Sequence, residues 1–83
     1  MNPKVQKIKI ESAHIMSITF TNGEEKVFDF SPYLSYPIYE PLKDKSFFNK
    51  AKIFDGILIW DEWTDFDPDT LYLESKPKQA NYG

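Results

Sequence analysis

Two glycine-containing pairs, Asn22-Gly23 and Asp55-Gly56, constrain the fold of this chain more than any other feature. Each pair separates two runs with strand-like patterns, and the residues in it accept the positive φ angles that the preferred two-residue hairpin turn requires. The first pair lies between "HIMSITF" and "KVFDF", the second between "AKIF" and "ILIW", and "QKIKIE" adds a further alternating run at the start. The pattern predicts two antiparallel β-hairpins, with these side chains pointing into a core: Met16, Ile18, Phe20, Phe28 and Phe30.

The segment between the two hairpins carries helix signals. Ser31-Pro32 places a capping side chain before a residue with a preset φ, which predicts one helical turn at "SPYLS". Pro37 and Pro41 are expected to stop that helix from continuing. The apolar spacing in residues 42–51, "LKDKSFFNKA", favours a second short helix, with a strand as the alternative.

A third helix signal follows the second hairpin. Asp67 is expected to cap it, Pro68 to occupy its first position, and Asp69 to lie where the helix dipole favours a carboxylate. These elements predict a single α+β domain over residues 1–74: a small antiparallel sheet of two hairpins with a short helical insertion and a closing C-terminal helix. Residues 75–83 show no periodicity and are predicted to be a flexible tail.

Composition limits the class of protein. A length of 83 residues suffices for one hydrophobic core but not for two, and the lack of cysteine excludes disulfides and thiolate metal ligands. The first residues lack the apolar stretch of a signal peptide, and no run is long enough to cross a membrane, which predicts a cytoplasmic protein. A net charge of −3 opposes non-specific binding to nucleic acid.

The acidic run "DEWTDFDPD" raises the question of a metal site. Asp65, Asp67 and Asp69 imitate the opening of a calcium-binding loop. That loop requires glycine at its sixth position and glutamate at its twelfth, where this chain has Thr70 and Lys76. The helix start explains the later carboxylates, so no metal-binding residue is predicted here.

The inventory of reactive side chains also argues against catalysis. His14 is the sole histidine and is expected to be partly exposed at the start of a strand. Neither Ser12 nor Ser17 is placed to form a triad with it. Three glycines cannot form a glycine-rich phosphate loop. The sequence therefore predicts a non-enzymatic protein with no catalytic or cofactor-binding residue.

Aromatic residues make up 17% of the chain, more than a domain of this size can readily bury. Core and rim packing accounts for part of this content, because tryptophan and tyrosine are seldom fully buried. The same two residue types dominate binding hot spots in protein complexes. We therefore predict a protein contact formed by the loop that carries Tyr36 and Tyr39 together with Trp63.

The order of these features resembles a family of short bacterial proteins known as domain of unknown function 2442. The resemblance runs from about residue 5 to residue 73 and is most specific in its closing segment, "DFDPDTLY". It implies a small α+β fold in which the following residues are fold signatures rather than a reactive site: Gly23, Trp60, Asp65, Pro68, Leu71 and Tyr72. The chain departs from the family pattern at Trp63, where the family has glycine, and this side chain is expected to point outward.

The resemblance also implies a role. Proteins of this family are often encoded beside another small protein, in an arrangement similar to toxin-antitoxin pairs, and some carry a DNA-binding domain after the shared domain. This chain ends soon after Tyr72, so no second domain is expected. These properties predict that the protein binds a second copy of itself or a small co-encoded partner, in an antitoxin-like or regulatory accessory role.

Two other functions stay open from the sequence. The first is a small-molecule or metal-dependent site around Asp61, Glu62 and Asp65, with Trp60 and Tyr72 as its walls. The second is a nucleic-acid-associated regulator that binds through the lysines of its first strand, which would predict an affinity that falls steeply with salt.

Overall fold

The computed structural model describes residues 2–78, which form two antiparallel sheets around one core. Sheet A has the strand order β1-β2-β3-β7 and sheet B has the order β4-β5-β6. The strands of sheet A are β1 (Val5–Ser12), β2 (Ile15–Phe20), β3 (Glu25–Asp29) and β7 (Lys76–Pro77). The strands of sheet B are β4 (Lys52–Phe54), β5 (Ile57–Asp61) and β6 (Thr64–Phe66).

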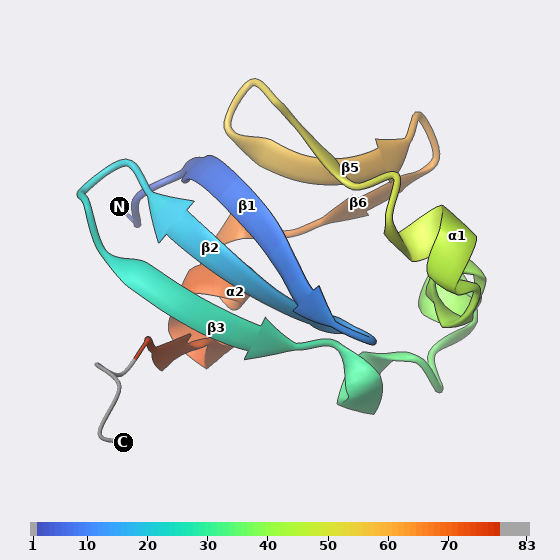
Figure 1. The fold of residues 1–83 in the computed structure, drawn as a ribbon. Helices are drawn as coiled ribbons and strands as arrows, with labels where there is room; N and C mark the ends of the chain where they lie inside the picture. The colour runs from blue at the N-terminus through green and yellow to red at the C-terminus, as the bar shows by residue number, and fades with distance from the viewer. Residues whose placement is uncertain (1, 79–83) are drawn as a thin grey trace, which may run out of the picture.

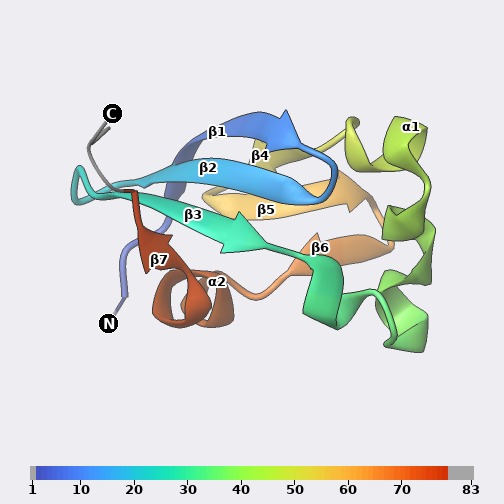
Figure 2. The ribbon, with the colours of Figure 1, turned by 60° about the horizontal axis from the view of Figure 1, so that its bottom comes forward.

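Short helices connect and cover the sheets. Two 3-10 helices and one turn of α-helix link sheet A to sheet B, and a last α-helix follows β6. They are η1 (Ser31–Tyr33), η2 (Pro37–Lys43), α1 (Lys45–Phe48) and α2 (Pro68–Glu74). Figures 1 and 2 show sheet A as one layer, sheet B and α2 packed on the other side of the core, and the η2–α1 segment closing one end. The α+β class is confirmed, with the two hairpins in separate sheets.

The core follows from the alternation of side chains along the strands. Met16, Ile18 and Phe20 of β2 are fully buried, as the pattern predicts. Sheet B and α2 contribute Leu58 and Leu71 to the same core. Aromatic rings fill its centre, where four rings surround Phe30 with centroid distances of 4.6–5.7 Å: Phe28, Phe48, Trp60 and Phe66.

The two predicted hairpin turns have different outcomes. Asp55 and Gly56 have φ angles of +53° and +79°, as a type I′ turn requires, and connect paired residues of β4 and β5. In the first hairpin only Gly23 has a positive φ, +90°, so the predicted two-residue Asn22-Gly23 turn is wrong. The loop has three residues, and the Asn22 side chain stabilises it by accepting a hydrogen bond from the backbone N–H of Glu24.

The helical segment between the sheets forms as predicted, but with other capping groups. Asp29, rather than Ser31, supplies the side chain at the start of η1, because its Oδ1 accepts the backbone N–H of Ser31 at 2.9 Å. Pro37 begins a second 3-10 helix instead of only ending the first, and that helix includes Pro41. Asp44 caps α1 by accepting the backbone N–H of residue 46.

The C-terminal boundary of the domain lies later than predicted. Ser75, which was assigned to the flexible tail, is buried, and β7 pairs with Lys26 and Val27 of β3. The backbone N–H of Lys78 donates to the carbonyl of Glu25, which continues this pairing by one residue. Residues 75–78 are therefore part of the fold, and residues 79–83 of the predicted tail lie outside the described residues.

Asp67 caps α2 as predicted. Its carboxylate accepts the backbone N–H of Thr70 at 2.9 Å and the hydroxyl of the same residue at 2.8 Å. These hydrogen bonds hold the pKa of the Asp67 carboxyl below its ordinary value of 3.8.

The cap predicts a specific pH dependence of stability. Folding lowers the pKa of the Asp67 carboxyl. The ionised carboxylate therefore stabilises the folded state fully above the ordinary pKa, and this stabilisation is lost as pH falls through the lower pKa of the folded state. Asp67→Ala is expected to cost about 1 kcal/mol at neutral pH. In urea titrations, the difference from wild type should shrink as pH falls below the ordinary pKa of 3.8. Asp67→Asn, which caps without ionising, is the control, and a constant difference for the alanine variant would contradict the assignment.

Candidate functional site

The outer face of sheet B exposes apolar side chains. Ile59 of the central strand lies between Lys52 on β4 and Asp65 on β6, and these three side chains share the face that points away from the core. Phe54 pairs with Ile57 on the same face. Of the apolar residues of β5, Leu58 and Trp60 on the inner side are buried, whereas Ile57 and Ile59 on the outer side are only partly covered.

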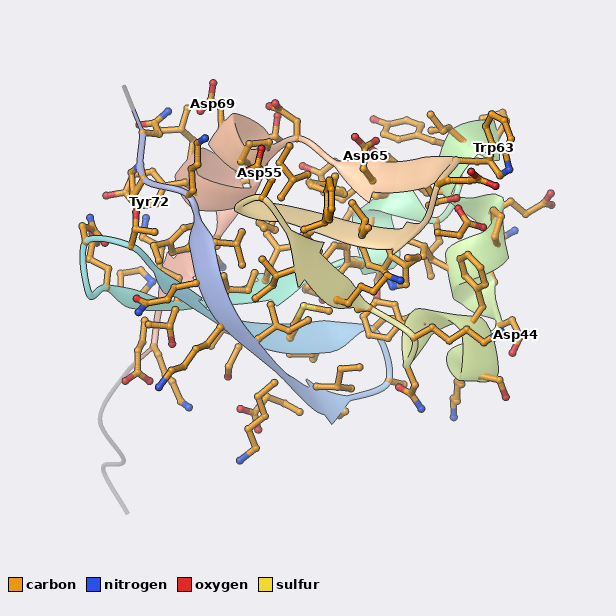
Figure 3. The ribbon with its side chains drawn as sticks, turned by 90° about the horizontal axis from the view of Figure 1, so that it is seen from above. Asp44, Asp55, Trp63, Asp65, Asp69 and Tyr72 are labelled. Carbon is orange, nitrogen blue, oxygen red and sulfur yellow. The ribbon has the colours of Figure 1, made fainter. Side chains whose placement is uncertain are left out.

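Seven residues of this face enclose a shallow groove of about 480 Å³, which we call the sheet B groove. Two of its apolar side chains are unusually exposed, Trp63 at 80% and Phe54 at 68%. Figure 3 shows Trp63 and Asp65 on this sheet, in a view from above. The complete lining consists of Lys52, Phe54, Ile59, Asp61, Glu62, Trp63 and Asp65.

The turn between β5 and β6 holds Trp63 outward. Asp61 pairs with Thr64, so Glu62 and Trp63 form the turn itself. The backbone N–H of Trp63 donates to Oδ1 of Asp61 at 2.9 Å, which fixes the turn through a side chain and without a positive φ at Trp63. Substituting tryptophan for the glycine expected here therefore displays an indole on the surface, as the sequence predicted.

The two tyrosines predicted to join Trp63 lie in different surroundings. Tyr39 stacks on Phe66 at a centroid distance of 5.1 Å and is largely covered. Burial raises the pKa of the Tyr39 hydroxyl, and the nearby carboxylates of Asp65 and Asp67 raise it further. Tyr39 is thus mainly a packing residue at the edge of the core.

Tyr36 is 53% exposed but lines a second groove, of about 500 Å³, along the edge of β3. Tyr33 lies beside it, and burial raises the pKa of the Tyr33 hydroxyl with smaller contributions from Glu74 and Tyr36. The sequence did not predict this groove, because it forms where α2 and β7 return to β3. The full lining is Ile15, Val27, Phe28, Asp29, Pro32, Tyr33, Tyr36, Glu74 and Lys76.

The residues predicted as fold signatures occupy structural positions. Trp60 is only 3% exposed, and its indole N–H donates to the carbonyl of Phe48 at 3.0 Å. The Tyr72 hydroxyl donates to the carboxylate of Glu24, and the Tyr72 ring packs against Phe20. Of the remaining signature residues, Leu71 is buried in the core, Gly23 has a positive φ, Pro68 begins α2, and Asp65 alone faces the sheet B groove.

The alternative site around Asp61, Glu62 and Asp65 is only partly assembled. All three carboxylates line the sheet B groove. Trp60 points into the core on the opposite side of β5, and Tyr72 packs on sheet A, so neither forms a wall of that groove. Among residues 2–78, no three acidic, histidine or cysteine side chains are grouped closely enough to hold a metal ion. The prediction that Trp60 and Tyr72 form the walls of this site is therefore wrong.

His14 has a structural position that the sequence did not indicate. It adopts a φ of +64° in the turn between β1 and β2, and Nε2 lies 2.7 Å from the carbonyl oxygen of Leu42. Its ring packs edge-on against Phe48 at 5.2 Å. The residue joins sheet A to the η2–α1 segment.

Lysines gather on the outer face of sheet A, together with carboxylates. Lys9 and Lys76 share this face through the register of β1, β2, β3 and β7. Lys78 lies 3.6 Å from Glu11 and 3.9 Å from Glu25. The face is therefore mixed in charge, which gives little support to a nucleic-acid surface. In the part of the chain that the structure describes, no helix is long and apolar enough to span a membrane.

Fold and site together define a small α+β domain with two separate sheets and an exposed aromatic groove. The chain belongs to the family described as "Protein of unknown function (DUF2442)", whose model matches residues 5–77. This finding confirms the family predicted from the closing segment. No curated protein and no solved structure matches the chain.

Proposed function

We propose that this chain is a non-enzymatic protein-interaction module whose contact surface is the sheet B groove. The observation that supports the proposal is the exposure of Trp63 and Phe54 on one groove. Burying a large apolar side chain contributes about 1.5–3 kcal/mol, so covering both would favour association substantially. Tryptophan is also among the residue types most enriched in binding hot spots.

The shape of the groove favours a protein over a small molecule as its occupant. Pockets for small molecules enclose most of the ligand surface, whereas this groove lies open along the face of a three-stranded sheet. A protein segment laid along that face could contact Trp63, Ile59 and Phe54 together. In this proposal the domain acts through the complex it forms, in an antitoxin-like or regulatory accessory role, with a second copy or a small co-encoded protein as partner.

The proposal predicts that Trp63→Ala weakens association without unfolding the domain. The side chain is 80% exposed, so its removal should change the free energy of unfolding by about 0.5 kcal/mol or less. Loss of a hot-spot tryptophan should weaken binding by about 2 kcal/mol or more. Light scattering would give the mass of the protein alone and after co-expression with the product of its neighbouring gene.

A matched control is Leu73→Ala, which removes a 65% exposed apolar side chain from α2, outside the groove. The expected outcome is a complex that forms with wild type and the Leu73 variant and dissociates with the Trp63 variant. A monomer under both conditions, or a complex indifferent to Trp63, would rule out the proposed surface.

A further inference from the structure

The sheet B groove combines apolar side chains with an excess of negative charge. Asp61, Glu62 and Asp65 line it, opposed by the single cation of Lys52. The sequence around the groove is equally biased, since residues 52–69 contain six carboxylates and one lysine. The chain as a whole has a net charge of only −3, so negative charge is concentrated on this part of the molecule.

Among the described residues, none of these carboxylates forms an ion pair. Both ion pairs found among residues 2–78 involve Lys78, on sheet A. Asp61 is partly occupied by the hydrogen bond from the Trp63 backbone, whereas Glu62 and Asp65 are exposed. The two carboxylates and the exposed indole therefore form a surface that is complementary to a cation carried on an apolar segment.

We infer that the sheet B groove binds a basic segment of a different protein chain, one that presents arginine or lysine beside apolar side chains. The inference rests on the proposed function and specifies its partner. A guanidinium group suits this surface best, because it can stack on the Trp63 ring while its N–H groups donate to Glu62 or Asp65. Lys52 lies across Ile59 from Asp65, so the basic side chains are expected to bind on the β6 side of the groove.

The same charges disfavour a second copy of the chain as the occupant. A two-fold symmetric dimer would place each groove against its own copy, so that six carboxylates would share one interface with two lysines. Like charges facing each other across an interface are unfavourable. Docking the groove onto the lysines of sheet A would be a head-to-tail contact, which extends into an open chain of molecules unless it closes into a ring.

A peptide titration followed by NMR tests the inference directly. The probe is an N-acetylated, C-amidated pentapeptide of alternating arginine and leucine, and its control has glutamate in place of arginine. The protein has two tryptophans, so it gives two indole N–H signals, one from exposed Trp63 and one from buried Trp60. The basic peptide should shift the Trp63 signal and leave the Trp60 signal in place. Raising salt from about 50 mM to about 500 mM should weaken the binding.

Charge reversal identifies the residues responsible. The double variant Glu62→Lys/Asp65→Lys should weaken binding of the basic peptide by about tenfold or more. Glu25→Lys is the control, because it changes an exposed carboxylate on sheet A, away from the groove. Equal shifts with both peptides, or an affinity unchanged in the double variant, would overturn the inference.

The outcomes also separate this inference from the proposed function. A complex that requires Trp63 but is unaffected by charge reversal and salt would leave the interaction module standing and reject the basic partner. A homodimer that dissociates on Trp63→Ala would likewise support the interaction module and reject the basic partner. Absence of any Trp63-dependent complex would remove the proposed function itself.

Discussion

Replacing Phe30 with alanine is expected to destabilise the domain by about 3–5 kcal/mol. The Phe30 side chain is fully buried, and its ring lies 5.3–5.7 Å from those of Phe48, Trp60 and Phe66. The Phe48 ring belongs to α1 and the other two rings belong to sheet B, so the cavity would lie where these elements meet the end of β3. A domain of this length has a total unfolding free energy of about 4–12 kcal/mol, so the variant should be largely unfolded or close to it. Urea unfolding followed by circular dichroism measures the loss.

Two variants control for this result. Phe30→Leu keeps most of the apolar volume and should lose less stability than the alanine variant. Trp63→Ala removes a larger aromatic side chain from the surface and should lose about 0.5 kcal/mol or less. If Phe30→Ala unfolded at the same urea concentration as wild type, the placement of Phe30 at the centre of the core would be incorrect.

Replacing Trp60 with alanine should have a comparable effect, about 3–5 kcal/mol. The indole fills the core and also donates its N–H to the carbonyl of Phe48, at the end of α1. The two effects can be separated with Trp60→Phe, which keeps an aromatic ring but removes the donor. That variant removes one of two hydrogen bonds to the Phe48 carbonyl, which still accepts the backbone N–H of Ala51 at 3.2 Å, so its loss should cost about 0.5–1.5 kcal/mol.

The structural role of Trp60 can be checked independently of stability. In the Trp60→Phe protein the NMR signals of the backbone amides in α1 should shift, because the hydrogen bond to the carbonyl of Phe48 is lost. The indole signal that remains, from Trp63, should keep its position. A shift confined to the β5–β6 turn would contradict the hydrogen bond.

Periodicity predicted the strands because alternation of side chains directly reflects burial. It placed Met16, Ile18 and Phe20 in the core, where the structure has them. It did not predict that the hairpins form two sheets, since this depends on packing between segments distant in sequence. The turn at Asn22-Gly23 was also missed. An Asn-Gly pair fits a two-residue turn and equally fits a three-residue turn whose last residue is glycine, so the pair alone does not distinguish them.

The candidate site was predictable only in part. Trp63 could be identified because it stands where the resemblance to the family led us to expect glycine. Phe54 was missed, since an apolar residue in a strand is ordinarily assigned to the core, although here the register with Ile57 turns it outward. Tyr39 was predicted at the surface, whereas its ring stacks on Phe66.

The late pairing of β7 with β3 has a consequence for how the chain folds during synthesis. The β3 edge is left unpaired until residues 76 and 77, about 50 positions later, are available to cover it. An unpaired strand edge is a template for association with other chains. The first three strands should therefore form an aggregation-prone hairpin sheet while the ribosome completes the chain, and the last described residues protect the domain by closing that edge.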